Sequence, residues 1–152
     1  MLSGKLIHLI QSHHREIADR VIREIGRHPD LVHLRCLPEA ELRDRGAVIL
    51  EHLESWLVSE RDEIVRKQEE IGKLRFQQSV PLHEVVIGLL LIKNKMLDYL
   101  EEQGNPRDSL GLYAEEELEK RIGRFFDTLV VHSVRGYEAA WHHSVELAAA
   151  TV

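Results

Sequence analysis

Ten histidines stand out in this 152-residue sequence as groups that could bind a metal ion or haem. A di-iron helical bundle needs repeated Glu-x-x-His or His-x-x-x-Glu units, because residues three or four apart project from the same face of a helix. One such unit is present, Glu138-x-x-x-His142-x-x-x-Glu146, and the sequence has no second unit to face it. Adjacent histidine pairs elsewhere diverge by roughly 100° around a helix and do not chelate together. The spacing therefore predicts no metal site.

Three histidines, His14, His52 and His132, fall on apolar faces of the predicted helices. A histidine in that position could ligate haem or face a small-ligand pocket, so these three are the candidate pocket residues. The alternative is a histidine at the edge of the core, bonded to a backbone carbonyl or a neighbouring side chain. Cys36 is the single cysteine and no Cys-x-x-Cys-His motif is present, which argues against attached haem, zinc and iron–sulfur clusters. We predict no cofactor, with haem as the alternative.

Motifs for catalysis are missing from the sequence. It contains no Gly-x-Ser-x-Gly elbow, no Gly-x-Gly-x-x-Gly and no Gly-x-x-x-x-Gly-Lys loop. The dipeptide His83-Glu84 resembles the phosphoacceptor site of histidine kinases, but Val-Val-Ile-Gly-Leu follows it where that family has Leu-Arg-Thr-Pro-Leu. The chain also lacks an ATP-binding domain. We expect a protein that is not an enzyme.

The elements that carry these residues are predicted to be helices. Apolar residues recur at helical spacing between the few prolines and glycines, without the alternation typical of strands. We therefore expect one all-α domain spanning residues 1–152, with about five helices. Their expected ranges are about 3–26, 38–57, 59–76, 81–103 and 106–150. The last helix is long, and it is either continuous or bent or broken near Gly111 or Gly123.

The last predicted helix carries two apolar seams. The first consists of Leu118, Ile122, Phe125, Leu129 and His132, and it would face the core of the domain. The second consists of Val130, Val134, Tyr137, Trp141 and Val145, and it continues farther along the helix. A helix of about forty residues is about 60 Å long, more than one small bundle covers. The second seam is therefore the predicted dimer interface, packed against a parallel copy of itself; the alternative is a helix that folds back.

Composition excludes several classes of protein. Hydrophobic residues make up 43% and charged residues 30%, a balance typical of soluble globular domains. The net charge of −6 disfavours binding to nucleic acid or to anionic lipid. The longest apolar run, residues 85–92, is far too short to cross a bilayer. The lone Cys36 and the absence of a signal-peptide pattern favour the cytoplasm.

Residues 72–93 carry a more specific pattern, Gly-Lys-Leu-Arg-Phe-Gln-Gln-Ser-Val-Pro-Leu-His-Glu-Val-Val-Ile-Gly-Leu-Leu-Leu-Ile-Lys. The pattern resembles the helix junction in the N-terminal domain of RsbR-type stressosome co-antagonist proteins, and the layout of nearly the whole chain fits that domain. The resemblance implies a globin-like bundle without haem that dimerises and acts as a sensor in bacterial signal transduction. It also implies a last helix that leads to an effector. Since no sulfate-transporter/anti-sigma-antagonist module occurs in the sequence, either the output goes to a separate signalling protein or the chain is a piece of a larger one.

The same junction contains two charged residues of opposite sign. Arg75 lies in the last turn of one predicted helix and Glu84 in the first turn of the next, positions that complement the helix dipoles. A short turn separates them. We therefore predict an ion pair between Arg75 and Glu84 that fixes the corner between these helices.

Overall fold

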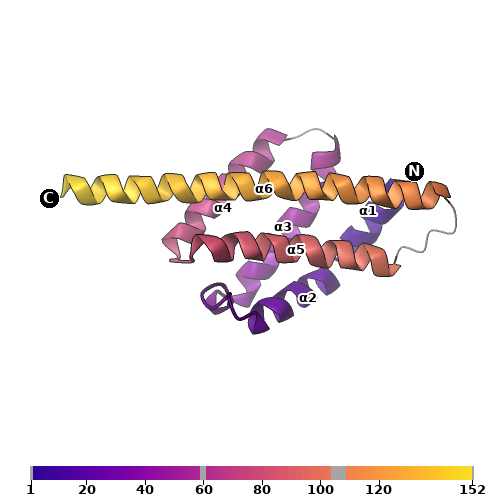
Figure 1. The fold of residues 1–152 in the computed structure, drawn as a ribbon, viewed down its shortest axis with the longest axis horizontal. Coiled ribbons are helices and arrows are strands. Elements are labelled where there is room, and N and C mark those ends of the chain that lie inside the picture. Colours follow the sequence, from indigo (N-terminus) through magenta and orange to yellow (C-terminus); the bar gives the residue numbers. More distant parts are fainter. Residues whose placement is uncertain (1, 59–60, 104–108, 152) are drawn as a thin grey trace.

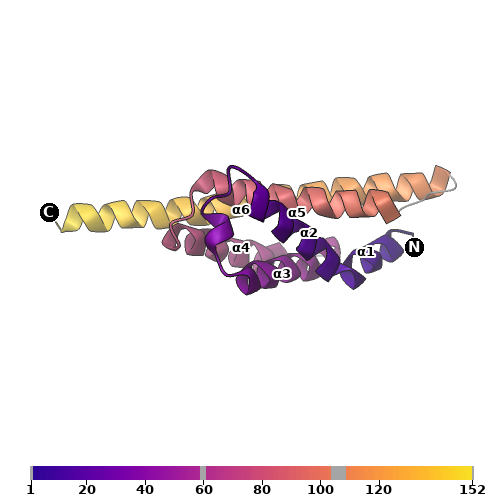
Figure 2. The same cartoon turned by 90° about the horizontal axis from the view of Figure 1, so that it is seen from below.

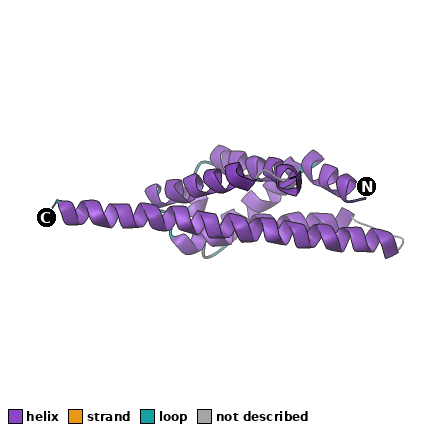
Figure 3. Ribbon diagram, turned by 90° about the horizontal axis from the view of Figure 1, so that it is seen from above, coloured by secondary structure: helices purple, strands orange, loops and turns teal. Residues whose placement is uncertain are grey.

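Helices account for nearly all of the part of the chain that the computed structural model describes, which is residues 2–58, 61–103 and 109–151 (Figures 1 and 3). Side chains are described there except at residues 2–3, 51–52 and 54–58. The elements are α1 Leu2–Ser12, α2 His14–Arg27, the 3-10 helix η1 Leu34–Cys36, α3 Glu39–Val58, α4 Arg61–Gln77, α5 Leu82–Gln103 and α6 Ser109–Ala150. No strand occurs within these ranges, and the prediction of an all-α fold with a long last helix is confirmed.

Helices α5 and α6 form an antiparallel pair along the long axis of the molecule (Figure 1). Turned by 90°, the molecule shows α1, α2 and α3 on one side of this pair (Figure 2). Helix α4 packs most extensively against α6, and α2 contacts both α3 and α5. Each helix therefore buries one face against at least one neighbour, as expected for a helical bundle.

Buried apolar side chains form two clusters. The larger one joins residues from all of α1 to α6, and its bulkiest fully buried members are Tyr99, Phe125 and Phe126. The smaller one joins the end of α2, the loop before α3 and the start of α5, and it contains Val21, Ile25, Leu31, Leu34, Val80 and Val85. Among the described helices, none is both long and apolar enough to span a membrane.

Two glycines let the backbones of α4 and α6 approach each other. A Cβ atom added at Gly72 would overlap the carbonyl oxygen of Ser133, and one at Gly136 would overlap the carbonyl oxygen of Glu69. The contact is reciprocal, since each helix offers a glycine to the backbone of the other. No side chain larger than hydrogen fits either position unless the helices move apart.

The first predicted helix, 3–26, is wrong in one respect, because the structure divides it at His13. The imidazole Nδ1 atoms of His13 and His14 lie 2.9 Å from the carbonyl oxygens of Leu9 and Gln11. A carbonyl oxygen can only accept a hydrogen bond, so each imidazole ring donates one to a carbonyl at the end of α1. There the ring competes with the backbone N–H groups that would continue the helix. His13 takes φ −114° and ψ 24°, outside the helical region, and the described residues form six α-helices rather than about five.

Helix α6 is continuous for 42 residues and is not bent or broken at Gly111 or Gly123. A Cβ atom at Gly123 would have open space around it, so this glycine is not needed for packing. The last ten helical residues, 141–150, extend past the bundle (Figures 1 and 3), and every one of them is exposed. We call residues 141–150 the distal segment.

Candidate functional site

The turn between α4 and α5 is closed by backbone hydrogen bonds. The Val80 N–H donates to the carbonyl of Arg75, and the Gln78 N–H donates to the carbonyl of Leu74. Ser79 between them has φ 60°, the left-handed conformation common just after a helix. This turn places α4 and α5 side by side, so that the polar residues at their adjoining ends face the loop before α3 and the start of α3.

Arg75, only 5% exposed, is bound at the start of α3. Its Nη1 lies 2.8 Å from Glu41 Oε1 and 2.7 Å from Gln78 Oε1, while Gln78 Nε2 donates to the same Glu41 oxygen. Burial lowers the pKa of Arg75, and Arg45 adds to this effect by repulsion, although Glu41 opposes both. The hydrogen bond from Gln78 and the charge of Arg75 lower the pKa of Glu41 in spite of its partial burial.

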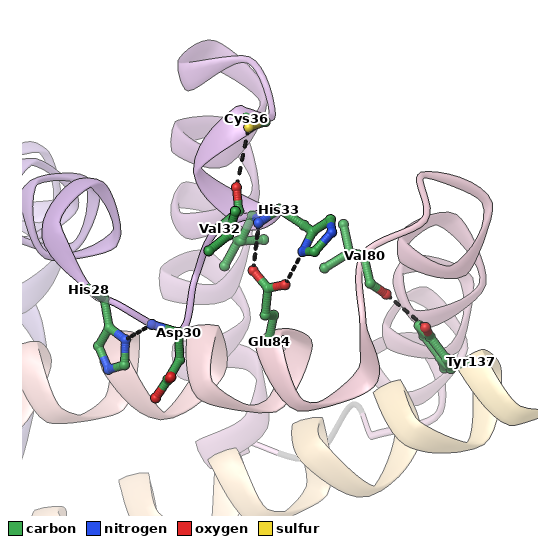
Figure 4. A network of polar contacts seen from close by, with 9 residues as sticks. His28, Asp30, Val32, His33, Cys36, Val80, Glu84 and Tyr137 are labelled. Carbon is green, nitrogen blue, oxygen red and sulfur yellow. Dashed lines mark hydrogen bonds and ion pairs between the residues drawn. The ribbon is translucent and has the colours of Figure 1, made fainter.

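Glu84, 1% exposed, binds the loop before α3 rather than Arg75. Its carboxylate accepts hydrogen bonds from the backbone N–H groups of His33 and Leu34, at 2.9 and 3.0 Å, and His33 Nδ1 lies 2.7 Å away (Figure 4). Burial acts to raise the pKa of Glu84, but these hydrogen bonds outweigh it and the pKa is lowered.

The predicted ion pair between Arg75 and Glu84 is therefore wrong. Arg75 is paired with Glu41 in the first turn of α3, and Glu84 is paired with His33 in the loop before α3. Sequence reasoning placed both residues correctly at the corner and missed the third segment, because sequence separations of 34 and 51 residues leave no local signal. The corner joins three segments instead of two.

Tyr137 fixes α6 to this corner. Its hydroxyl donates to the carbonyl of Val80 at 2.7 Å (Figure 4), and its ring packs edge-on against Phe76 with centroids 5.4 Å apart. Val80 itself is buried. The hydroxyl of this predicted interface residue is thus used within the domain.

The members of the predicted dimer seam fall into two groups. Val130, Val134 and Tyr137 are partly covered by their own domain. Trp141 and Val145 lie in the distal segment and are each 54% exposed. The surface left for a partner is therefore the distal segment, where Leu147 adds a third exposed apolar side chain.

A cavity of about 70 Å³ lies beside the corner, between α2, α3, α4, α5 and α6. Most of its wall is isoleucine, leucine and valine. Arg45 and Arg75 contribute charge to the wall, and Gln68 and Ser133 contribute polar groups. Leu34 closes one side, where it meets Gly88 so closely that a Cβ at this glycine would lie 2.9 Å from the leucine methyl group.

Gln68 and Ser133 link α4 to α6 inside the core. Gln68 is 4% exposed, Ser133 is fully buried, and Gln68 Nε2 donates to Ser133 Oγ at 2.7 Å. Gln68 is buried although most of its neighbours in the sequence are charged. The sequence did contain the signal, because Ile64, Gln68, Ile71 and Arg75 recur at helical spacing and are all buried.

Of the candidate pocket histidines, His14 and His132 do not line the cavity. His14 is half-buried with its Nδ1 on the carbonyl of Gln11, and His132 lies on α6 with its Nδ1 3.3 Å from Glu69 Oε1. The side chain of His52 lies outside the described residues. Among the side chains that are described, no three His, Cys, Asp or Glu residues are grouped so that they could hold a metal ion. For His14 and His132 the arrangement matches the alternative of a bonded histidine at the edge of the core.

Haem does not fit the cavity. Pockets for drug-sized ligands measure roughly 300–1,000 Å³, several times its volume of about 70 Å³. Among the described side chains that line it, none is a histidine, cysteine, methionine or tyrosine, the usual axial ligands of haem iron.

Comparison with known proteins gave one match. The family described as the RsbT co-antagonist protein rsbRD N-terminal domain matches residues 15–149. No curated protein and no solved structure matches the chain. The matched range contains the corner, the cavity and nearly all of α6.

Proposed function

Because the chain belongs to the family of RsbT co-antagonist rsbRD N-terminal domains, we propose that it is a homodimeric, non-enzymatic sensor domain of a stressosome-related signalling system. A signal changes the packing of the helices around the corner and the cavity, and α6 carries the change to a downstream signalling protein. The lone thiol of Cys36, which is exposed, favours the reducing cytoplasm as the location.

The observation that supports this function most strongly is the form of α6. One helix runs from the core, where Ser133 and Gly136 are buried, into the distal segment, where Trp141 is exposed. A rigid element with one end inside a domain and the other end outside it suits the transmission of small movements. An exposed apolar stripe on a projecting helix suits pairing with a second copy of itself.

The substitution Trp141→Asp tests this proposal. It places a charge in the middle of the proposed dimer contact, so the variant should be a monomer by light scattering where the wild type is a dimer. Leu112→Asp is the matched control, since Leu112 is 50% exposed on α6 but lies near the other end of the helix. A Trp141→Asp variant that stays dimeric would remove the distal segment as the interface.

The absence of haem is part of the proposal and is tested by absorbance and metal analysis of freshly purified protein. The proposed domain is colourless and free of stoichiometric metal. A Soret band or stoichiometric iron would contradict the proposal and favour the alternative, a haem- or metal-binding sensor, with the candidate histidines His14, His52 and His132 as the first residues to replace.

A further inference from the structure

We propose that the cavity beside the corner binds a small organic anion, a monocarboxylate with a short apolar tail. This assignment rests on the sensory function proposed above and names the class of ligand that the domain detects. The carboxylate meets Arg75 and Arg45, and the tail lies against the apolar wall formed by residues such as Ile49, Ile71 and Leu89.

The size of the cavity limits the tail. A volume of about 70 Å³ is several times the roughly 10–15 Å³ that one water molecule requires. An acid of two to four carbon atoms is of that order, whereas a long acyl chain is not. An apolar wall favours a carbon tail over water, because water in such a site has too few hydrogen-bonding partners.

Charge selects an anion. Two arginines line the cavity, and the carboxylate that contacts them is Glu41, bound to Arg75. Arg45 makes no ion pair within the described part of the chain. Glu41 thus balances Arg75, and the partly exposed Arg45 leaves positive charge beside the cavity that favours binding of an anion.

The side chains of Arg75 and Gln68 also carry N–H groups that can donate hydrogen bonds to a ligand. The contacts of Arg75 with Glu41 and Gln78 both use Nη1, so within the described residues its Nε and Nη2 groups have no acceptor. Gln68 uses one N–H of its amide for Ser133 and has a second one to donate. Both side chains are more than nine-tenths buried, where an unused donor is costly. A carboxylate accepts from both.

Binding of an anion in the cavity can affect the position of α6. Ser133 belongs to the wall of the cavity and lies in the same helix as the distal segment. The wall also includes residues of α2, α3, α4 and α5, so a bound anion would favour the arrangement of helices that holds its contacts best. A ligand shifts such an equilibrium by its difference in affinity between the two arrangements.

The test is a titration of the full ¹⁵N-labelled chain with sodium propionate, followed by amide chemical shifts, with sodium chloride at equal ionic strength as the blank. Propionamide serves as the neutral analogue of the same shape. We expect shifts confined to amides around the cavity on α3, α4 and α6. We also expect binding of propionamide that is weaker by about tenfold or more, the equivalent of one charge-assisted hydrogen bond.

Arg45→Gln should weaken propionate binding by about tenfold, and Arg45→Lys should restore part of the affinity. Arg43→Gln is the matched control, because Arg43 lies on the same helix, does not line the cavity and pairs with Asp19 and Glu39 at the surface. Gln68→Met tests the amide donor with little change in volume. Circular dichroism checks that each variant is folded.

Three results would each overturn the assignment: propionate shifts no larger than those with chloride, equal binding of propionamide, or equal loss of affinity in the Arg43 and Arg45 variants. The ligand assignment and the proposed sensory function can fail independently of each other. A wild type that is dimeric by light scattering but does not respond to propionate contradicts the ligand alone. A monomeric protein that binds propionate contradicts only the proposal that the domain acts as a homodimer.

Discussion

The two ends of α6 differ in what their side chains contact, although they belong to one uninterrupted helix. Up to Tyr137, the helix lies against α1, α4 and α5, and it contributes the buried Phe125, Phe126 and Leu129 to the larger core cluster. From Trp141 onward every helical residue is exposed. The first part is therefore stabilised by tertiary packing, whereas the distal segment buries none of its residues in the isolated chain.

This difference separates two roles that the sequence alone presents as one seam. The seam from Val130 to Val145 has a single helical spacing, yet its first three members are partly covered by their own domain. A substitution in the first part of α6 should therefore change the stability of the fold. A substitution in the distal segment should leave the fold unchanged and affect association.

The largest effect on stability is expected at the crossing of α4 and α6. Gly136→Ala places a methyl group against the backbone of Glu69 and should lower the free energy of unfolding by about 3 kcal/mol. Gly123→Ala on the same helix is the control, because a Cβ there meets open space and should stabilise the protein by about 0.5–1 kcal/mol. Urea unfolding measures both. Equal effects of the two substitutions would show that the close approach of the helices is not required.

The next largest loss of stability is expected when Glu84 is replaced. Glu84→Gln keeps the shape of the side chain but loses the charge that accepts from His33 and Leu34, at an expected cost of about 2 kcal/mol at neutral pH. Glu16→Gln is the control, since Glu16 makes an exposed ion pair with Arg20 and is worth little. A Glu84 variant as stable as the Glu16 variant would contradict the structural role of the corner.

The pH dependence of stability has the sign set by the lowered pKa of Glu84. Because the pKa is lower in the folded than in the unfolded state, the stabilisation is complete above the usual value of 4.5 and is lost as the pH falls through the folded-state value. Glu41 acts in the same direction. The wild type should therefore lose stability below about pH 4.5, and Glu84→Gln should lose less over that range. Parallel curves for the two proteins would contradict this prediction.

A smaller effect is expected at the end of the packed part of α6. Tyr137→Phe removes the hydrogen bond to the carbonyl of Val80 and should cost about 1 kcal/mol. Tyr113→Phe, on the same helix but 65% exposed, should have no measurable effect. Thermal unfolding distinguishes them, and light scattering should find both as dimeric as the wild type. If Tyr137→Phe dissociates the dimer instead, the packed part of α6 also belongs to the interface.

Local pattern predicted the helices well and the contacts between them poorly. Apolar spacing indicated the ranges of α3 to α6 because a helix must bury one face whatever it packs against. The break at His13 was missed because it depends on imidazole rings that donate to nearby carbonyls. The partners of Arg75 and Glu84, and the need for glycine at positions 72 and 136, depend on which segment lies opposite.

The most direct test of the difference between the two parts of α6 is hydrogen exchange along this helix, measured at low and high protein concentration. Amides of residues 118–137 should be protected at both concentrations, whereas those of the distal segment should exchange rapidly in dilute solution and become protected on dimerisation. In Trp141→Asp the distal amides should exchange rapidly at every concentration. Distal amides that remain protected both in dilute wild type and in Trp141→Asp would contradict a distal segment free to bind a second copy.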